Sequence, residues 1–252
     1  MRDNLKRFGR GMLNLLAFLV FVIAVQWGLR SHPGPLAAVI MPLLALGVYC
    51  AGVRWIEGRH PVELTDPRGA AELPLGIGIG IVLFAAVMFL LLAVGDYHPE
   101  GWGTAWPLVA GALFAVLSAV LEEIIFRGFL YRLTSALFGT WGALLLTSVL
   151  FGAGHIANPS ATVGSSAAIA LEAGILLGAA YALTQRLWLP IGIHAGWNFA
   201  EGSIFGMTVS GFSGGKSSLI RGTLHGPTLL TGGAFGPEAS ILAVVEIGRA
   251  HV

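Results

Sequence analysis

Long apolar runs separated by short polar segments dominate the chain. A helix needs roughly 20 mostly apolar residues to cross the hydrocarbon core of a bilayer. Seven runs meet that length, and an eighth begins near residue 238; the seven cover 11–29, 35–54, 75–95, 107–131, 139–156, 162–184 and 187–206. Several of them are rich in Gly and Ala, which favours close helix packing in lipid. The pattern therefore predicts an all-α fold, a polytopic bundle of seven or eight transmembrane helices.

Composition supports this fold class and excludes others. Of the 252 residues, 56% are hydrophobic and 11% are charged, whereas a soluble domain carries about a quarter charged residues. The net charge of +1 and the absence of a basic tract argue against a nucleic-acid partner. Cys50 is the single cysteine, so neither an intrachain disulfide nor a cysteine metal site can form. The lipid bilayer is the partner that composition predicts.

Basic residues predict the orientation of the spans. They precede the first run and follow the second, fourth and sixth: Arg2, Lys6, Arg7, Arg10, then Arg54, Arg59, Arg68, then Arg132, then Arg186. The N-terminus is therefore predicted to be cytoplasmic in a multi-pass protein of the cell membrane. Lys216 and Arg221 fall on the predicted outside and do not follow the rule. No small-residue cleavage site follows the first run, so we expect an uncleaved first span.

Few ionisable or strongly polar side chains interrupt the spans. A charge at membrane depth costs about 2.5–3.5 kcal/mol on insertion scales, so it usually faces a cavity or a partner. The set consists of Glu122, Glu123, Arg127, His155, Glu172, His194, Asn198 and Glu201. Counting about 1.5 Å per residue along each helix places the groups of three spans near mid-membrane, in the cytoplasmic half, where they can meet.

Spacing separates the roles of these groups. Glu123 and Arg127 are four residues apart and can form an ion pair on one helix face. Glu122 points about 100° away and lacks a local partner, which suits a general base acting on water. His194 and Asn198 also share one face, and both can donate hydrogen bonds to a developing oxyanion.

Each cluster also has a purely structural explanation. Glu122, Glu123 and Arg127 could mark a charged helix end at the membrane surface. His155 could cap its helix, and His194 with Asn198 could bond two helices together. Glu172 is better explained as a structural residue; Glu201 could end its helix or support the site from behind. Three polar clusters on three spans that can converge are harder to explain as unrelated features.

Three motifs resemble those of one family: EExxxR as Glu122, Glu123 and Arg127, FxxxH as Phe151 and His155, and HxxxN as His194 and Asn198. Together, in this order, they resemble the CPBP family of CAAX prenyl proteases and bacteriocin-processing enzymes, also called Abi. The flanking LWLPIGIHAGWNF and LLTGGAFGPE are similar to bacterial members. The resemblance covers about residues 105–240.

The resemblance implies an intramembrane endopeptidase with an all-helical fold and a protein or peptide substrate. Glu122 and His155 would activate water, His194 and Asn198 would bind the oxyanion, and Glu123 with Arg127 would orient the site. Members of this family are called metalloproteases. The chain lacks an HExxH motif, but Glu122, His155 and His194 could supply a zinc ligand set from three helices. Metal-free hydrolysis activated by Glu122 is an equal alternative.

Two other classes of function stay open. Buried carboxylates could serve a proton- or cation-coupled transporter, although no repeat with broken helices is visible. The chain could also be a non-catalytic membrane protein, such as an immunity factor, that binds a partner on the same fold.

The predicted organisation has three parts: N-terminal transmembrane helices over 1–104, a catalytic membrane domain over 105–245, and a tail over 246–252. The tail reads EIGRAHV, which is the translation of a common sequencing adapter, GAGATCGGAAGAGCACACGTC. We therefore expect residues 246–252 to be non-native.

Overall fold

The computed structural model describes residues 2–31, 35–105, 107–212 and 218–249, and nearly all of them lie in helices. The elements are α1 (Arg2–Ser31), α2 (Pro35–Gly52), the π-helical turn η1 (Val53–Glu57), α3 (Val62–Thr65), α4 (Gly69–Val94), β1 (Tyr97–Trp102), α5 (Pro107–Glu123), the π-helical η2 (Ile124–Tyr131), α6 (Arg132–Gly154), the 3₁₀ turn η3 (His155–Ala157), α7 (Val163–Ile169), the π-helical η4 (Ala170–Gly174), α8 (Ile175–Thr184), α9 (Trp188–Phe199), the π-helical η5 (Ala200–Ile204), β2 (Ile220–Leu224), α10 (Thr228–Thr231), the 3₁₀ turn η6 (Pro237–Ala239) and α11 (Ile241–Arg249).

This architecture confirms the predicted all-α membrane bundle. Within the described ranges, five helical stretches are apolar and long enough to cross a membrane, and the stretch Leu108–Ala157 holds two of the predicted spans. Large apolar side chains point outward along these helices, among them Leu16, Val82 and Phe89. Such an apolar exterior suits contact with lipid tails. The chain is a multi-pass membrane protein.

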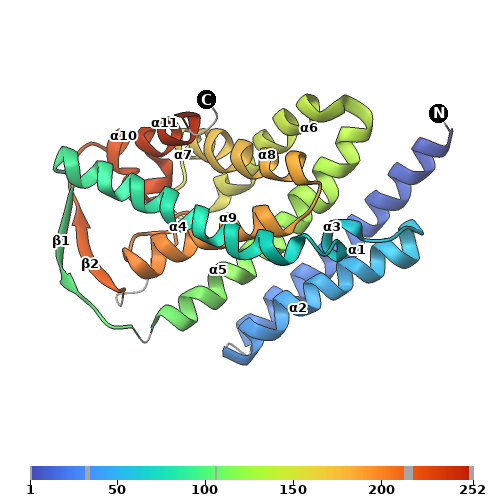
Figure 1. The fold of residues 1–252 in the computed structure, drawn as a ribbon, viewed down its shortest axis with the longest axis horizontal. Coiled ribbons are helices and arrows are strands. Elements are labelled where there is room, and N and C mark those ends of the chain that lie inside the picture. The colour runs from blue at the N-terminus through green and yellow to red at the C-terminus, as the bar shows by residue number, and fades with distance from the viewer. Residues whose placement is uncertain (1, 32–34, 106, 213–217, 250–252) are drawn as a thin grey trace.

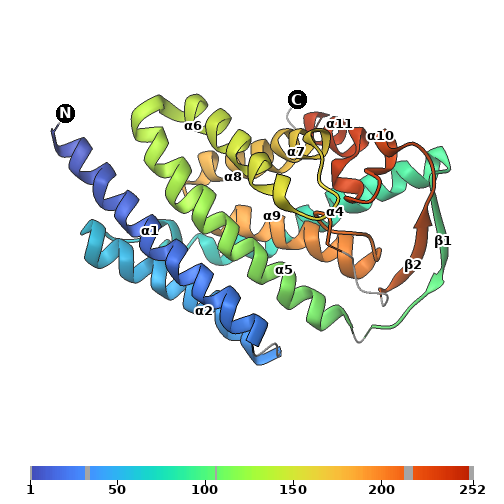
Figure 2. The same cartoon turned by 180° about the vertical axis from the view of Figure 1, so that it is seen from behind.

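The helices group around α5 and α9 (Figures 1 and 2). The pair α1 and α2 lies along α5 and η2. On another side, α6 packs against η2, α7 and α8, and α8 packs against α9. Gly139, with φ of 70°, turns the chain inside α6, so the predicted spans 107–131 and 139–156 are joined by a helical segment that reverses there. The predicted eighth span corresponds to η6 and α11, and residues 250–252 of the predicted tail lie outside the described residues.

A small antiparallel sheet accompanies the helices. β1 pairs with β2, with Tyr97 opposite Leu224 and Trp102 opposite Ile220, and the register shifts between Pro99 and Gly101. These strands were not predicted from the sequence. They tie the connection after α4 to the segment that precedes α10 at one end of the molecule (Figure 1).

The helices α4 and α9 are in close backbone contact. A Cβ added to Gly80 would lie 2.1 Å from the carbonyl oxygen of Ile193, and one added to Gly196 would lie 2.3 Å from that of Ile77. Gly76 and Gly192 have the same relation to the opposite backbone. Each helix thus carries glycines four residues apart that face the other helix, the arrangement that allows backbones to touch in lipid. This contact fixes α9, which carries His194 and Asn198.

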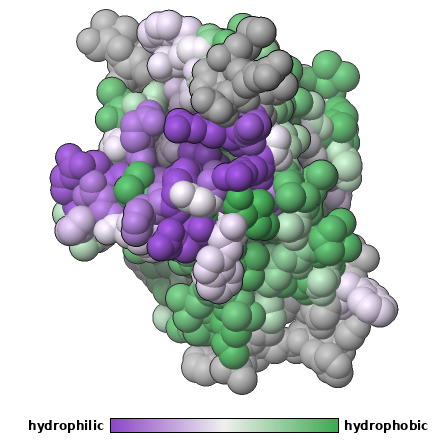
Figure 3. Space-filling view, turned by 90° about the vertical axis from the view of Figure 1, so that its right-hand side faces the viewer, coloured by the Kyte–Doolittle hydropathy of each residue, from purple (hydrophilic) through white to green (hydrophobic). Residues whose placement is uncertain are grey.

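Ion pairs gather at the other end of the bundle. Figure 3 shows a hydrophilic patch framed by apolar surface, at the end where α3 and the N-terminal part of α1 lie. The pairs join Arg59 to Glu57 and Glu63, Arg132 to Glu57, Arg68 to Asp66, and Arg186 to Glu72. These residues belong to the loops predicted as cytoplasmic. That this end faces the cytoplasm is a prediction from its basic residues.

Candidate active site

The site begins where α5 passes into the π-helical turn η2. Glu122 and Glu123 are the last residues of α5, and Arg127 lies within η2. π-Helical turns are rare and occur frequently at functional sites. Glu123 and Arg127 are fully buried, whereas the Glu122 side chain is 31% exposed. The two adjacent carboxylates therefore occupy different environments, as their spacing predicted.

Glu123 connects two motifs. Its Oε1 accepts a hydrogen bond from Arg127 Nη1 at 2.8 Å and another from His194 Nδ1 at 2.9 Å. Arg127 also donates from Nη2 to the carbonyl oxygens of Ala173 and Gly174, and its guanidinium carbon lies 4.7 Å from the centre of the Phe151 ring. A buried charge needs this degree of pairing to be stable. The Glu123–Arg127 pair holds η2, η4 and α9 together.

His155 follows α6 directly, in the turn η3. Its Nδ1 lies 2.8 Å from the carbonyl oxygen of Phe151. A carbonyl oxygen can only accept a hydrogen bond, so Nδ1 carries the proton and neutral His155 presents the Nε2 lone pair. That Nε2 lies 3.8 Å from Glu122 Oε2, too far for a direct hydrogen bond and suited to a water that contacts both groups.

His194 has a comparable arrangement on α9. The Glu123 carboxylate accepts from its Nδ1, so neutral His194 presents an Nε2 lone pair and only the imidazolium has an Nε2–H to donate. His194 was predicted from the sequence to donate to an oxyanion, and with Nδ1 bonded to Glu123 it can do so from Nε2 only as the imidazolium. Asn198, one turn further, donates from Nδ2 to Ser118 Oγ at 3.3 Å.

A cavity of about 460 Å³ reaches these groups. Its polar lining consists of Glu122, His155, His194, Asn198, Asn158, Ser118 and Ser210, and its apolar lining includes Val22 and Val25 of α1. Glu122 from α5, His155 from η3, and His194 with Asn198 from α9 thus face one space. This volume is within the range of small-molecule sites and can admit a short peptide segment.

A divalent metal has an incomplete ligand set in this arrangement. Both histidines present Nε2 and have Nδ1 bonded to an acceptor, which is the usual outer arrangement of a zinc ligand. However, no three His, Cys, Asp or Glu side chains of the described ranges lie close enough together to hold a metal ion. A metal would therefore lack a complete ligand set among the described side chains.

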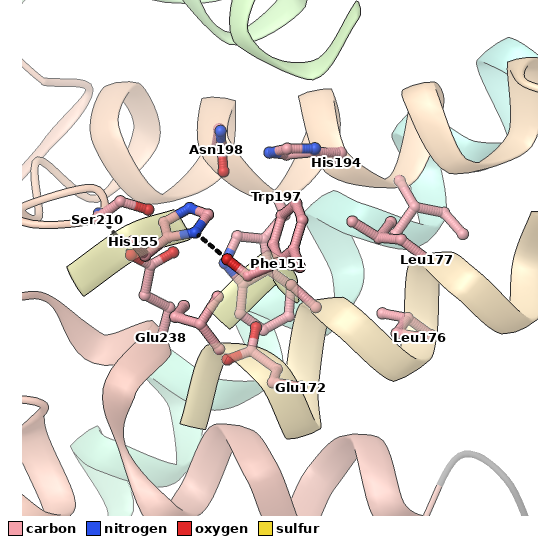
Figure 4. A pocket seen from close by; sticks show the side chains of 13 residues that line it. Phe151, His155, Glu172, Leu176, Leu177, His194, Trp197, Asn198, Ser210 and Glu238 are labelled. Atoms are coloured by element: carbon pink, nitrogen blue, oxygen red, sulfur yellow. Dashed lines mark hydrogen bonds between the residues drawn. The ribbon is translucent and has the colours of Figure 1, made fainter. Parts of the chain in front are cut away.

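Three further carboxyl groups lie close to the site. Glu172 in η4, Glu201 in η5 and Glu238 in η6 are each at most 4% exposed. Glu172 and Glu238 line a second, small cavity together with Phe151, His155, His194 and Asn198 (Figure 4). From the sequence, Glu172 was predicted to be structural and Glu238 had no predicted role. The pattern GAFGPEAS was the available signal, because its glycines allow the turns that bring Glu238 inward.

The fold and the site together define a polytopic membrane protein with an acid–histidine centre enclosed by its helices. Residues 104–200 match a family model described as type II CAAX prenyl endopeptidase Rce1-like. This segment contains all three motifs, and its similarity to CAAX-type endopeptidases supports the CPBP family.

A second comparison finds similarity to a protein that is named as an antiporter and not as a protease. The chain is 31% identical over 142 residues to a protein named Na⁺/H⁺ antiporter NhaA of Rhizobium meliloti (strain 1021). The match covers 53% of this chain and 32% of that protein, so the chain spans about a third of the length of the curated relative it matches. No solved structure matches the chain.

Proposed function

We propose that this protein is an intramembrane endopeptidase that hydrolyses a peptide bond in a membrane-associated protein or peptide. The observation that carries the proposal is the convergence of Glu122, His155, His194 and Asn198 on one cavity within the bundle. The match of residues 104–200 to CAAX-type endopeptidases supports the same reaction class.

Water activation is the first proposed step. A water between Glu122 and the Nε2 of His155 donates one proton to the Glu122 carboxylate while its oxygen attacks the peptide carbonyl carbon. The carbonyl oxygen becomes an oxyanion. Asn198 Nδ2 and the Nε2–H of the His194 imidazolium donate hydrogen bonds to that oxygen, and Glu123 and Arg127 fix the position of His194.

Collapse of the tetrahedral intermediate completes the reaction. Protonated Glu122 returns its proton to the leaving nitrogen as the carbon–nitrogen bond breaks, which yields a carboxylic acid and an amine and restores the Glu122 carboxylate. The apolar part of the cavity, with Val22, Val25, Phe114 and Leu117, would hold an apolar portion of the substrate.

Cleavage of a peptide library tests the proposal. Detergent-purified wild type and Glu122→Gln would be incubated with the library, with and without a zinc chelator, and products would be mapped by mass spectrometry. We expect fragments from wild type in both chelator arms and none from Glu122→Gln. Equal fragments from both proteins would reject Glu122 as the base, and loss of wild-type cleavage only with chelator would show that a metal is required. No cleavage by either protein would favour a partner-binding role.

Cation–proton exchange is a second candidate, favoured by the similarity to the protein named as a Na⁺/H⁺ antiporter. Such exchange needs ionisable groups inside the membrane, and Glu172 and Glu201 are buried carboxyl groups of this kind. Wild-type proteoliposomes containing a pH-sensitive dye would be given a sodium gradient. Dye response above that of empty liposomes would support exchange, and an unchanged response together with peptide cleavage would leave the endopeptidase.

A further inference from the structure

A further cavity lies at the end of the bundle where the ion pairs gather, away from the proposed catalytic groups. Its volume is about 470 Å³, and the described residues that line it differ from those of the 460 Å³ cavity. Its walls come from the start of α1, the end of η1 with the residues after it, and the start of α6. The charged lining consists of Arg7, Glu57, Arg59 and Arg132, so three guanidinium groups share this space with one carboxylate.

Ion pairs hold two of these arginines in place. Glu57 accepts hydrogen bonds from Arg132 Nη2 and from Arg59 Nε, each at 2.9 Å. Asn14 Nδ2 also donates to Glu57, at 2.8 Å. On its other side, Arg59 donates to both oxygens of Glu63, at 2.7 and 2.9 Å. The Glu57 side chain is 5% exposed, whereas those of Arg59 and Arg132 are 30% and 21% exposed. Buried carboxylates therefore fix two guanidinium groups that remain open to the cavity.

Two more arginines at this cavity have no such partner. Arg7 and Arg10 are exposed, and within the described ranges their side chains form no ion pair. Arg10 adjoins the cavity, because a Cβ added to Gly58 would lie 3.7 Å from its Nη1. The four guanidinium groups thus outnumber the two carboxylates by two charges. Guanidinium groups bind phosphate through paired N–H donors, so this surplus is suited to a phosphate group.

Apolar side chains continue from the cavity onto the outer surface of the bundle. Phe8 and Leu137 line it, and Leu137 is 49% exposed, as is its neighbour Phe138 at 62%. Trp55 in η1, two residues before Glu57, is 81% exposed, and exposed tryptophans are typical of the boundary between lipid and water. Figure 3 shows the hydrophilic patch of this end bordered by apolar surface. Cations beside an apolar wall at such a boundary match a ligand with a charged head and an apolar tail.

We propose that this cavity binds the phosphate headgroup of an anionic phospholipid, with Arg7 and Arg132 facing the phosphate and an acyl chain along Leu137. Basic pockets between membrane helices are known to bind such headgroups. The lipid would join α1 to η1 and α6, since all three line the cavity. The same α1 carries Val22 and Val25, which line the 460 Å³ cavity. Lipid binding itself does not depend on the proposed endopeptidase function.

Native mass spectrometry of the delipidated, detergent-purified full chain tests the proposal. The protein would be titrated with palmitoyl-oleoyl phosphatidylglycerol and, separately, with phosphatidylcholine that has the same acyl chains. The two lipids differ in net charge and share their apolar part. We expect wild type to bind phosphatidylglycerol at least about tenfold more tightly, because the cavity carries surplus positive charge. Equal retention of the two lipids would overturn the proposal.

Three variants separate this cavity from general attraction to a basic surface. Arg7→Gln removes one unpaired charge from the cavity and should weaken phosphatidylglycerol binding about fivefold. Lys6→Gln is the matched control, since it removes one exposed charge from the neighbouring position, which does not line the cavity; its affinity should stay within about twofold of wild type. Ala136→Phe keeps every charge but fills the cavity from an exposed position, and should also weaken binding at least about fivefold. Equal losses in Arg7→Gln and Lys6→Gln would overturn the assignment to this cavity.

Two further measurements identify the source of the phosphate and check the fold. Glycerol 3-phosphate, which has no acyl chain, should bind far more weakly than phosphatidylglycerol, and equal affinity would overturn the lipid in favour of a soluble phosphate ligand. Thermal melting without lipid establishes that each variant is folded. Added phosphatidylglycerol should raise the melting temperature of wild type and Lys6→Gln more than that of Arg7→Gln, because a ligand that binds the folded state stabilises it by mass action. If Ala136→Phe does not fold, Arg7→Gln and Lys6→Gln still decide the proposal.

Discussion

The contact between α4 and α9 predicts a large effect from one added methyl group. Gly80→Ala would place a Cβ 2.1 Å from the Ile193 carbonyl oxygen, whereas ordinary contacts begin near 3.4 Å. The two backbones must therefore separate by roughly 1 Å at this point, because neither helix backbone can rotate away. Overpacking of this kind costs about 1–3 kcal/mol.

The displacement would also reach the proposed catalytic groups. His194 follows Ile193 directly, so a shift of α9 moves its imidazole relative to Glu123, which now lies at 2.9 Å. A misplacement of about 1 Å can reduce catalysis by roughly 100-fold. We therefore expect Gly80→Ala to lower both the melting temperature and the rate of peptide cleavage.

Gly78→Ala is the matched control. It lies on the same helix, two residues away, and an added Cβ there meets nothing within 4 Å. The assay is thermal unfolding of detergent-purified protein, followed by initial cleavage rates. Gly78→Ala should match wild type in both. Equal behaviour of Gly80→Ala and Gly78→Ala would refute the close backbone contact.

Three further perturbations have defined outcomes. Arg127→Met should lower the free energy of unfolding by about 3–5 kcal/mol, since it leaves the buried Glu123 carboxylate without its cation; chemical denaturation measures this, and a loss below 1 kcal/mol would contradict the buried pair. Burial favours a higher pKa for Glu63, but the hydrogen bonds and charge of Arg59 outweigh it, so its folded pKa lies below the ordinary value of about 4.3. Its contribution to stability is therefore present above that ordinary value and is lost as pH falls through the lowered folded pKa; melting curves from neutral to acid pH should fall less steeply in Glu63→Gln than in wild type, and parallel curves would be inconsistent with this pairing. Asn198→Ala should reduce kcat by about 10²–10³ with a smaller change in KM, since its amide is proposed to bind the transition state; a change confined to KM would instead indicate substrate binding.

Hydropathy predicted the spans because a backbone in lipid must satisfy its hydrogen bonds within each helix. The i,i+4 spacing likewise predicted the contact between Glu123 and Arg127, which is local to one helical segment. The strand Tyr97–Trp102 was missed, since it is short, contains Pro99 and Gly101, and depends on a partner far along the chain.

Contacts between distant segments could not be predicted from spacing. The hydrogen bond from His194 to Glu123 requires the glycine contact that fixes α9 against α4. From the sequence, these glycines indicate only that some helices pack closely, and not which two helices do so. Glu238 lines the same small cavity as His155 only because the turns at Gly232 and Gly236 return the chain to the site. In both cases tertiary packing, and not local periodicity, sets the geometry.

The most direct test of the central claim is the initial cleavage rate of one quenched fluorescent peptide, taken from the library products, by folded wild type and folded Glu122→Gln. Glu100→Gln serves as the control, because Glu100 is an exposed carboxylate on β1. General-base catalysis contributes about 10²–10⁴, so Glu122→Gln should lose at least about 100-fold and Glu100→Gln should match wild type. A Glu122→Gln rate within a few fold of wild type would contradict water activation by Glu122.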